Sequence, residues 1–323
     1  MEKIKEEKGM NVLISSLSKK VPLIKTVKNA LKAFGENSRL FGGDSDKNCI
    51  GRYFTDEFWH MPKLDVLTKE DVLAYAKKNK ISCIIPTRNG ELLFWSKIKT
   101  FLLKEDIHVM VSSRSALKIC LDKQLFFEFL SEHHFPAIVT SSNILDIEAN
   151  RFVVKEKEGT GSCDIGLDLT KNKAIEHAKA LKDPIFQPFV TGQEYTVDLY
   201  IDKQGVVQGC IARKRLLIAS GESQITETEK NRPLEELCAK IALAIGLKGH
   251  LVFQAIENKS KKSYSIVECN PRFGGASTLS VEAGLNSFSW FFLEALNKSL
   301  PPFKRIKDEI KMVRHAEDLY FHL

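Results

Sequence analysis

The segment Glu268–Arg272 (ECNPR) carries the residue types of a magnesium site at the end of an alternating apolar and polar stretch. Side chains of an extended strand alternate between its faces, so Glu268 and Asn270 share one face and Cys269 points to the other. Gln254 lies on a second alternating stretch, and the charged loop between the two predicts a hairpin that places Gln254 opposite this pair. Such oxygen donors suit Mg²⁺, or Mn²⁺ in its place, and leave positions for phosphate oxygens.

Arg272 follows the predicted strand directly, where its planar guanidinium can bind the same phosphates in a bidentate manner. Taken alone, Glu268–Arg272 fits equally well an edge strand with a polar outer face that ends in a Pro-containing turn.

A second candidate phosphate site is the strand Phe152–Lys155, which runs into a loop containing Gly161 and Ser162. Backbone N–H groups of such a loop can cover phosphates while Lys155 supplies a positive charge. No Gly-Lys-Ser/Thr opens a helix here, so this is not a Walker motif. A plain hairpin loop is the alternative, and Lys123 on a predicted helix is by default a solvent-facing lysine.

A third candidate is the apolar strand around Gln187 that runs through Phe189 and Val190 into an extended linker. Its backbone donors and acceptors can pair with an adenine edge, and Glu194 can accept hydrogen bonds from ribose hydroxyls. An ordinary strand–turn–strand is the alternative.

The elements that position these residues follow two patterns. Up to residue 114, buried strands alternate with helices, which predicts a parallel, doubly wound sheet with ligands at the strand carboxyl ends. The expected strands are 11–16, 38–43, 81–86 and 107–112, the helices 22–34, 69–78 and 91–103, and the ligand-side segments 15–18, Asp44 and 87–91. Each of these polar segments can instead be a simple turn.

From residue 115 the pattern becomes antiparallel β, after one predicted helix over 116–133. The expected strands are 152–156, 165–169, 185–190, 194–201, 206–213, 251–256 and 264–269, interrupted by helices 171–181 and 233–244. The stretches 197–201 and 206–211 predict a hairpin.

Composition narrows the class of protein. The 323 residues exceed one ordinary core, and the net charge of +7 comes from 48 basic and 41 acidic residues that are interspersed. No arginine-rich arm, aromatic platform or membrane-spanning run is present, so we expect neither nucleic acid nor membrane as a partner. Seven scattered cysteines predict no disulfide framework and fit a cytoplasmic protein. Met10 is an alternative start, because the first strand follows it.

Taken in order, these motifs closely resemble the ATP-grasp superfamily, and more narrowly the carbamoyl-phosphate-synthase-like ATP-grasp ligases, over residues 11–300. The resemblance implies a flexible N-terminus (1–10), a Rossmann-like pre-ATP-grasp domain (11–114), and a two-lobed ATP-grasp domain with antiparallel sheets. The lobes would span 115–190 (small) and 191–302 (large), followed by a C-terminal tail (303–323).

The resemblance also assigns roles to the motif residues. Lys123 and Lys155 would contact the α- and β-phosphates of ATP under the loop with Gly161 and Ser162. The stretch from Gln187 through Phe189 to Val190 would form the adenine hinge, and Glu194 would bind the ribose. Gln254, Glu268 and Asn270 would hold Mg²⁺, and Arg272 would stabilise the transferring γ-phosphoryl group. Arg213 or Arg215 would lie near phosphate or acceptor, with the strand register deciding which one faces the site.

This sequence departs from the family pattern at Glu156, which replaces a common proline, at Cys163-Asp164, where a glycine is common, and at Gln254, which is a carboxylate in many relatives. The chemistry implied is transfer of phosphate from ATP to a small-molecule carboxylate, followed by attack of an amine or thiol, with 273–278 as an acceptor-side loop. Carbamoyl phosphate formation and a non-catalytic ATP-binding module are the alternatives. The acceptors remain unidentified, and the oligomeric state is open, with a homodimer as one option.

Overall fold

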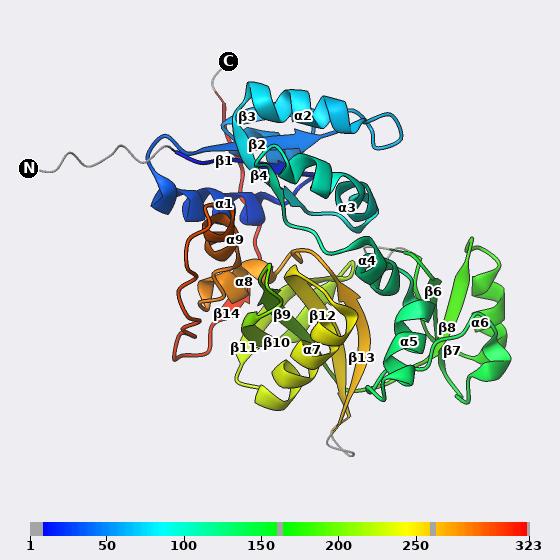
Figure 1. The fold of residues 1–323 in the computed structure, drawn as a ribbon. Helices are drawn as coiled ribbons and strands as arrows, with labels where there is room; N and C mark the ends of the chain where they lie inside the picture. The colour runs from blue at the N-terminus through cyan, green and yellow to red at the C-terminus, as the bar shows by residue number, and fades with distance from the viewer. Residues whose placement is uncertain (1–8, 160–163, 259–262, 322–323) are drawn as a thin grey trace, which may run out of the picture.

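The computed structural model describes residues 9–159, 164–258 and 263–321. Figure 1 shows three β-sheets that follow one another along the chain, each with its own helices. The first sheet is parallel, and the other two are antiparallel.

The N-terminal unit is built on a five-stranded parallel sheet in the order β3-β2-β1-β4-β5. Its strands are β1 (Asn11–Ser15), β2 (Arg39–Asp44), β3 (Glu57–His60), β4 (Ile81–Pro86) and β5 (His108–Val109), and its helices are α1 (Val21–Leu31), η1 (Lys32–Phe34), η2 (Ile50–Phe54), α2 (Lys69–Lys78) and α3 (Asn89–Leu103). The chain winds outward from β1 to β3 and then crosses back to β4. The strand order therefore reverses between β1 and β4, where sheets of this kind bind ligands.

Helices cover both faces of this sheet. Val12 and Ile14 of β1 point into a core with α1, whereas Leu13 points into a second core with α2 and α3. The alternation follows from the two-residue period of a strand. The parallel, doubly wound sheet predicted from the sequence is confirmed.

The small sheet has the order β7-β6-β8. It consists of β6 (Phe152–Glu156), β7 (Gly166–Leu169) and β8 (Pro184–Pro188), with η3 (Ile144–Asp146) and α6 (Lys171–Ala178) packed against it. The preceding helices α4 (Arg114–Leu121) and α5 (Lys123–Glu132) pack their buried residues against the large sheet described next. The prediction of one helix over 116–133 is wrong. Asp122 is extended and its carboxylate caps α5 by accepting from the N–H groups of Gln124 and Leu125, so Lys123 begins a new helix.

The large sheet has the order β13-β12-β9-β10-β11-β14. Its strands are β9 (Gln193–Ile201), β10 (Val207–Ala219), β11 (Glu222–Glu229), β12 (Gly249–Asn258), β13 (Ser263–Asn270) and β14 (Lys311–Val313). Helix α7 (Arg232–Ile245) buries its apolar side against β9 and β12. The predicted β9–β10 hairpin is confirmed, with Val207 opposite Ile201.

Several elements were not predicted from the sequence. Strand β10 continues six residues beyond the predicted end at Arg213 and pairs with the unpredicted β11, while β14 adds to the edge of β11. Helices α8 (Ser277–Glu282) and α9 (Ser287–Ala295) follow β13, and α9 packs its aromatic residues against α1 of the N-terminal unit. Short length and irregular polarity hide these elements in the sequence.

Within the described ranges, we find no helix that is both long and apolar enough to cross a lipid bilayer.

Candidate active site

A cavity of about 590 Å³ opens where the three sheets meet. The N-terminal unit contributes the loops after β1 and β4, the small sheet contributes Lys155 with nearby Lys123, and the large sheet contributes the carboxyl-terminal half of β10 and the ends of β12 and β13. The switch point of the parallel sheet therefore faces the strand end that bears Glu268, Asn270 and Arg272.

The β12–β13 pairing places the predicted metal ligands together. Gln254 lies directly opposite Glu268 in the antiparallel register. Asn270 donates from Nδ2 to Glu268 Oε1 at 2.7 Å, whereas the side chain of Cys269 is buried in the core behind the sheet. All three predicted ligands line the cavity.

Asn89, the first residue of α3, fixes the other end of this group. Its Nδ2 donates to Asn270 Oδ1 at 2.8 Å, and its Oδ1 accepts from Arg272 Nε at 2.8 Å. Arg272 also donates to Asn270 Oδ1 at 3.2 Å and to the Phe273 carbonyl at 2.9 Å. One amide of the N-terminal unit therefore orients both Asn270 and Arg272.

Lys155 is buried and has no hydrogen-bond partner among the described residues. Its side chain lines the cavity, is 7% exposed, and forms no hydrogen bond or ion pair with the part of the chain that the structure describes. Burial lowers its pKa to about 8, although Glu268 opposes the shift. A buried cation without a partner is costly, so this position favours an anionic ligand.

Lys123 has a different environment. Its Nζ donates to the carbonyls of Gly159 at 2.9 Å and Lys157 at 3.2 Å, which ties α5 to the loop after β6. Burial lowers the pKa of Lys123, and the carboxylates of Glu268 and Asp122 oppose that shift. The ammonium lines the same cavity as Lys155.

Glu268 lies between these cations. Burial raises its pKa, but the positive charges of Lys155 and Lys123 outweigh burial, so that its pKa is lowered and the carboxylate is ionised. The donor set of one carboxylate and two amide oxygens fits a Mg²⁺ ion that takes its remaining ligands from phosphates and water. No group of three His, Cys, Asp or Glu side chains that could hold a metal exists within the described residues.

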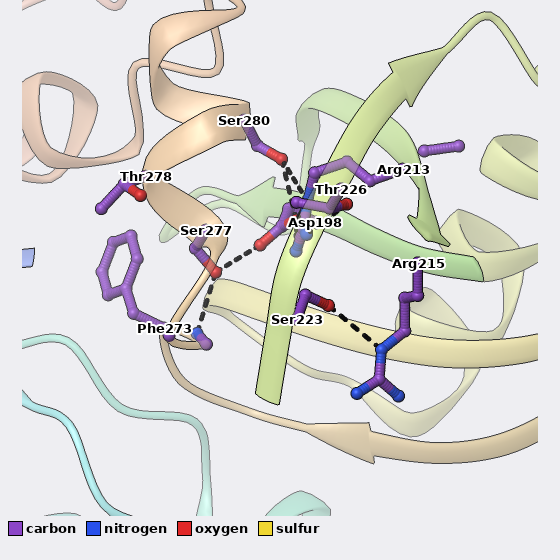
Figure 2. A network of polar contacts seen from close by, with 12 residues as sticks. Asp198, Arg213, Arg215, Ser223, Thr226, Phe273, Ser277, Thr278 and Ser280 are labelled. Atoms are coloured by element: carbon purple, nitrogen blue, oxygen red, sulfur yellow. Dashed lines mark hydrogen bonds and ion pairs between the residues drawn. The ribbon is translucent and has the colours of Figure 1, made fainter. Parts of the chain in front are cut away.

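Arg213 and Arg215 both point to the cavity side of β10, with Lys214 on the opposite face paired to Glu229. Arg213 is 1% exposed and its Nε and Nη2 lie 2.7 and 2.6 Å from Asp198 Oδ2. Arg215 instead pairs with Glu194 at 2.9 Å and donates to Ser223 Oγ at 3.2 Å. Figure 2 shows Arg213 turned into the network around Asp198, and the Arg215 guanidinium beside Ser223.

The loop after β13 is anchored to that same network. Ser277 donates to Asp198 and accepts from the Gly274 N–H at 2.8 Å, while Ser280 donates to Asp198 at 2.8 Å (Figure 2). His250 lies 3.1 Å from Asp198 and stacks on Phe273 with ring centroids 3.8 Å apart. Of the predicted acceptor-side loop 273–278, residues 273–276 line the cavity, and Ser277 already begins α8.

Other predicted residues lie elsewhere. Gln187 is buried and donates to Thr140 Oγ1 at 2.8 Å, and the described cavity lining does not include Gln187, Phe189, Val190 or Glu194. Gly161 and Ser162 lie outside the described residues. Asp44 accepts from the N–H groups of Ser18 and Asp46 and acts as a turn former. Glu156 lines the cavity, and its carboxylate accepts from the N–H groups of Lys182 and Asp183.

Sequence reasoning missed the basic residues of the N-terminal wall. Lys19 and Lys20 follow β1, and Arg88 and Asn89 follow β4, and all four line the cavity. Their position directly after a strand of a doubly wound sheet was the sequence feature that could have identified them as lining residues. Residues 87–91 were predicted as ligand-side, but Lys20 and the role of Asn89 were not.

These features define the ATP-grasp fold. Residues 180–317 match the sequence model of the family described as "ATP-grasp in the biosynthetic pathway with Ter operon", so this part of the chain is similar to ATP-grasp domains. Among curated proteins it is similar to the carbamoyl phosphate synthase large chain of Clostridium botulinum (strain Loch Maree / Type A3), with 24% identity over 275 residues. That match covers 75% of this chain and 24% of the relative, so the chain spans about a quarter of the relative's length.

Solved structures show the same fold over most of the chain. The biotin carboxylase domain of 2-oxoglutarate carboxylase from Hydrogenobacter thermophilus, with MgADP and bicarbonate, matches with a TM-score of 0.73 at 14% identity, covering 94% of this chain and 74% of that one. N5-carboxyaminoimidazole synthetase from Staphylococcus aureus, with ADP, matches with a TM-score of 0.72 at 16% identity, covering 92% and 79%. The ATP-grasp fold and the similarity to carbamoyl phosphate synthase expected from the sequence are confirmed.

Proposed function

We propose that this protein is a Mg²⁺-dependent, ADP-forming ligase that phosphorylates a small-molecule carboxylate with ATP and joins the acyl phosphate to an amine or thiol. The observation that carries the proposal is Lys155, a buried ammonium without a partner among the described residues, in a cavity that it shares with Glu268 and Arg272. A ligand with several phosphates would complete the hydrogen bonding of this position.

The chain's own residues supply charge and position. Lys155 and Lys123 would bind the phosphates of ATP, and Arg272, held by Asn89, would face the phosphoryl group in transfer. Gln254, Glu268 and Asn270 would hold Mg²⁺, which neutralises phosphate charge when bound. Arg215 would stand at the acceptor side of β10, because Arg213 is already neutralised by Asp198.

The domain roles follow the sheets. We propose residues 115–190 as the small lobe and 191–302 as the large lobe of the ATP clamp, with the adenine between them near Gln187–Val190 and the ribose near Glu194. Residues 11–114 would bind the acceptor, since the loops after β1 and β4 line the cavity next to Arg272.

The test is acceptor-dependent release of ADP by purified protein, with and without Mg²⁺, over pooled carboxylic acids with amines or thiols. We expect Glu268→Gln to lower that rate by about a hundredfold or more, because the only carboxylate of the metal set is lost. The exposed Glu36→Gln variant is the control and should keep the wild-type rate. Unchanged turnover of Glu268→Gln would contradict the assignment.

Phosphorylation of bicarbonate is a second candidate, favoured by the similarity to carbamoyl phosphate synthase and to the carboxylase domain with bound bicarbonate. Bicarbonate-dependent ADP release that needs no organic acid would select it. Binding of ATP without turnover in every mixture would contradict both reactions and leave a nucleotide-binding module.

A further inference from the structure

Apart from Arg213 and Arg215 of β10, the cations that line the cavity come from two units of the chain and from the end of β13. Lys123 and Lys155 belong to the small-sheet side, and Lys20 and Arg88 belong to the N-terminal unit, with Arg272 at the strand end between them. The first group shares the carboxylate of Glu268. The second group has no carboxylate of its own in the described lining.

The acidic side chains of the described lining are engaged elsewhere. Glu156 accepts from two backbone N–H groups, Glu222 pairs with Arg314, and Glu268 faces the lysines of the small-sheet side. Glu91 lies behind the wall, and its oxygens accept from the N–H groups of Thr87, Arg88 and the Trp95 indole.

Lys20 is held rigidly toward the cavity. Its Nζ donates to the carbonyls of Ser16 at 2.9 Å and Thr87 at 3.1 Å and to Thr87 Oγ1 at 2.8 Å, without an ion pair within the described chain. Burial lowers its pKa to about 8; Glu91 opposes the shift, and Arg272 and Arg88 reinforce it. Three cations close enough to repel one another therefore line one wall.

Arg88 completes this wall with an uncommitted guanidinium. Its side chain is exposed and forms no hydrogen bond or ion pair with the described residues, although it lines the cavity. A guanidinium in this state is available for bidentate binding of a carboxylate or phosphate.

We propose that Lys20 and Arg88, with Arg272 beside them, form a subsite for a second anionic group of the acceptor. This inference rests on the proposed ligase function, in which Lys123 and Lys155 take the phosphates of ATP. The acceptor is then a carboxylic acid that carries a further carboxylate or a phosphate. Its reacting carboxylate lies toward the phosphoryl group, and the second anion relieves the repulsion among the cations of the N-terminal wall.

The experiment measures binding by calorimetry to protein saturated with Mg²⁺ and the non-hydrolysable analogue AMPPNP, which fills the positions proposed for ATP. Glutarate is compared with butyrate, and 3-phosphoglycerate with glycerate, so that the two arms distinguish a second carboxylate from a phosphate. We expect at least one dianionic acid to bind about tenfold or more tightly than its monoanionic partner.

Arg88→Ala should remove about tenfold of that affinity while AMPPNP affinity changes less than twofold. Arg88 is exposed, so its loss should not affect folding, which the thermal midpoint checks. Arg39→Ala is the matched control, because it removes the same charge from the opposite end of the same sheet.

Equal affinity for dianionic and monoanionic acids, no binding of either, or wild-type affinity in Arg88→Ala would overturn the subsite. If the protein binds the dianion through Arg88 but releases no ADP with any acceptor, the subsite is supported and the ligase reaction is contradicted. The two failures are therefore distinguishable.

Discussion

Arg213 and Arg215 stand two residues apart on one face of β10, and their environments are opposite. Arg213 is sealed inside a network in which Asp198, Ser280 and Thr226 satisfy its guanidinium. Arg215 reaches the cavity, where it pairs with the half-exposed Glu194. Adjacent inward positions of one strand thus have two environments, the first inside a buried network and the second beside a half-exposed carboxylate at the cavity.

The same contrast holds for the two polar regions as a whole. Around Asp198 each charge is matched by a counter-charge, and burial, which raises the pKa of Asp198, is outweighed by Arg213 and His250, so that its pKa stays low. Along the cavity, Lys155, Lys20 and Arg88 form no ion pair with the described residues, although the charge of Glu268 acts on Lys155. A closed network stabilises the protein by itself, whereas an open set of cations costs stability until an anion binds.

The largest expected effect comes from opening the closed network. Asp198→Ala leaves Arg213 buried without a counter-charge, so we expect the free energy of unfolding in urea to fall by about 3–5 kcal/mol. The exposed pair Arg151–Asp168 has the same chemistry and a distance of 2.6 Å, so Asp168→Ala should cost less than about 1 kcal/mol.

The double variant Asp198→Ala/Arg213→Met should recover part of the loss, because it also removes the stranded charge. Equal destabilisation by Asp198→Ala and Asp168→Ala would show that burial does not make the first ion pair more important for stability than the second.

In the cavity region, removal of a charge should stabilise the protein instead of destabilising it. The effect should be visible in how the free energy of unfolding depends on pH. The pKa of Lys155 is about 8 in the folded protein against 10.5 for an unperturbed lysine, so between these values the unfolded chain binds more protons. The free energy of unfolding of nucleotide-free protein should therefore rise as pH increases from about 8 to 10.5, by at most about 3 kcal/mol from this group.

Lys155→Met should reduce this slope and stabilise the nucleotide-free protein at pH 7, while weakening ATP binding by about tenfold or more. The exposed Lys97→Met variant controls for the loss of one lysine. A Lys155→Met protein that is less stable than wild type at pH 7 would contradict the comparison.

The smallest effect is expected at Asn89, which joins the cavity region to the N-terminal unit. Asn89→Ala removes the amide that orients Asn270 and Arg272, so we expect kcat for ADP release to fall about tenfold with nucleotide affinity within twofold of wild type. Asn29→Ala, on the exposed side of α1, is the control. Loss of nucleotide affinity in Asn89→Ala with unchanged kcat would assign Asn89 to binding instead.

What the sequence could predict was local or periodic. Alternation together with the charged hairpin loop placed Gln254 opposite Glu268 and Asn270, and the strand–helix alternation predicted the parallel sheet. The order of the motifs pointed to ATP-grasp. Each of these signals resides within a few residues or in a regular repeat.

What it could not predict depends on partners distant in the chain. The environments of Arg213 and Arg215 depend on Asp198 and Glu194, which are distant from them in the sequence. The role proposed for Lys20 and Arg88 depends on Arg272, which lies beside them. Helices α8 and α9 follow a Gly-rich stretch that is typical of a loop, and they are stabilised by apolar contacts with α1, which lies far away in the sequence. Asp122 was read as a helical position, although its carboxylate is a helix cap.

The pairing of strand β14 affects how this part of the chain can be engineered. Arg314 donates from Nη2 to the Gly275 carbonyl at 2.8 Å and pairs with Glu222, which links the loop after β13 to the turn between β10 and β11. Removing the chain from residue 311 onward would expose β11 as an edge strand and invite self-association. Truncated variants should therefore keep residues 311–314, and an affinity tag or fusion partner should follow these residues through a spacer.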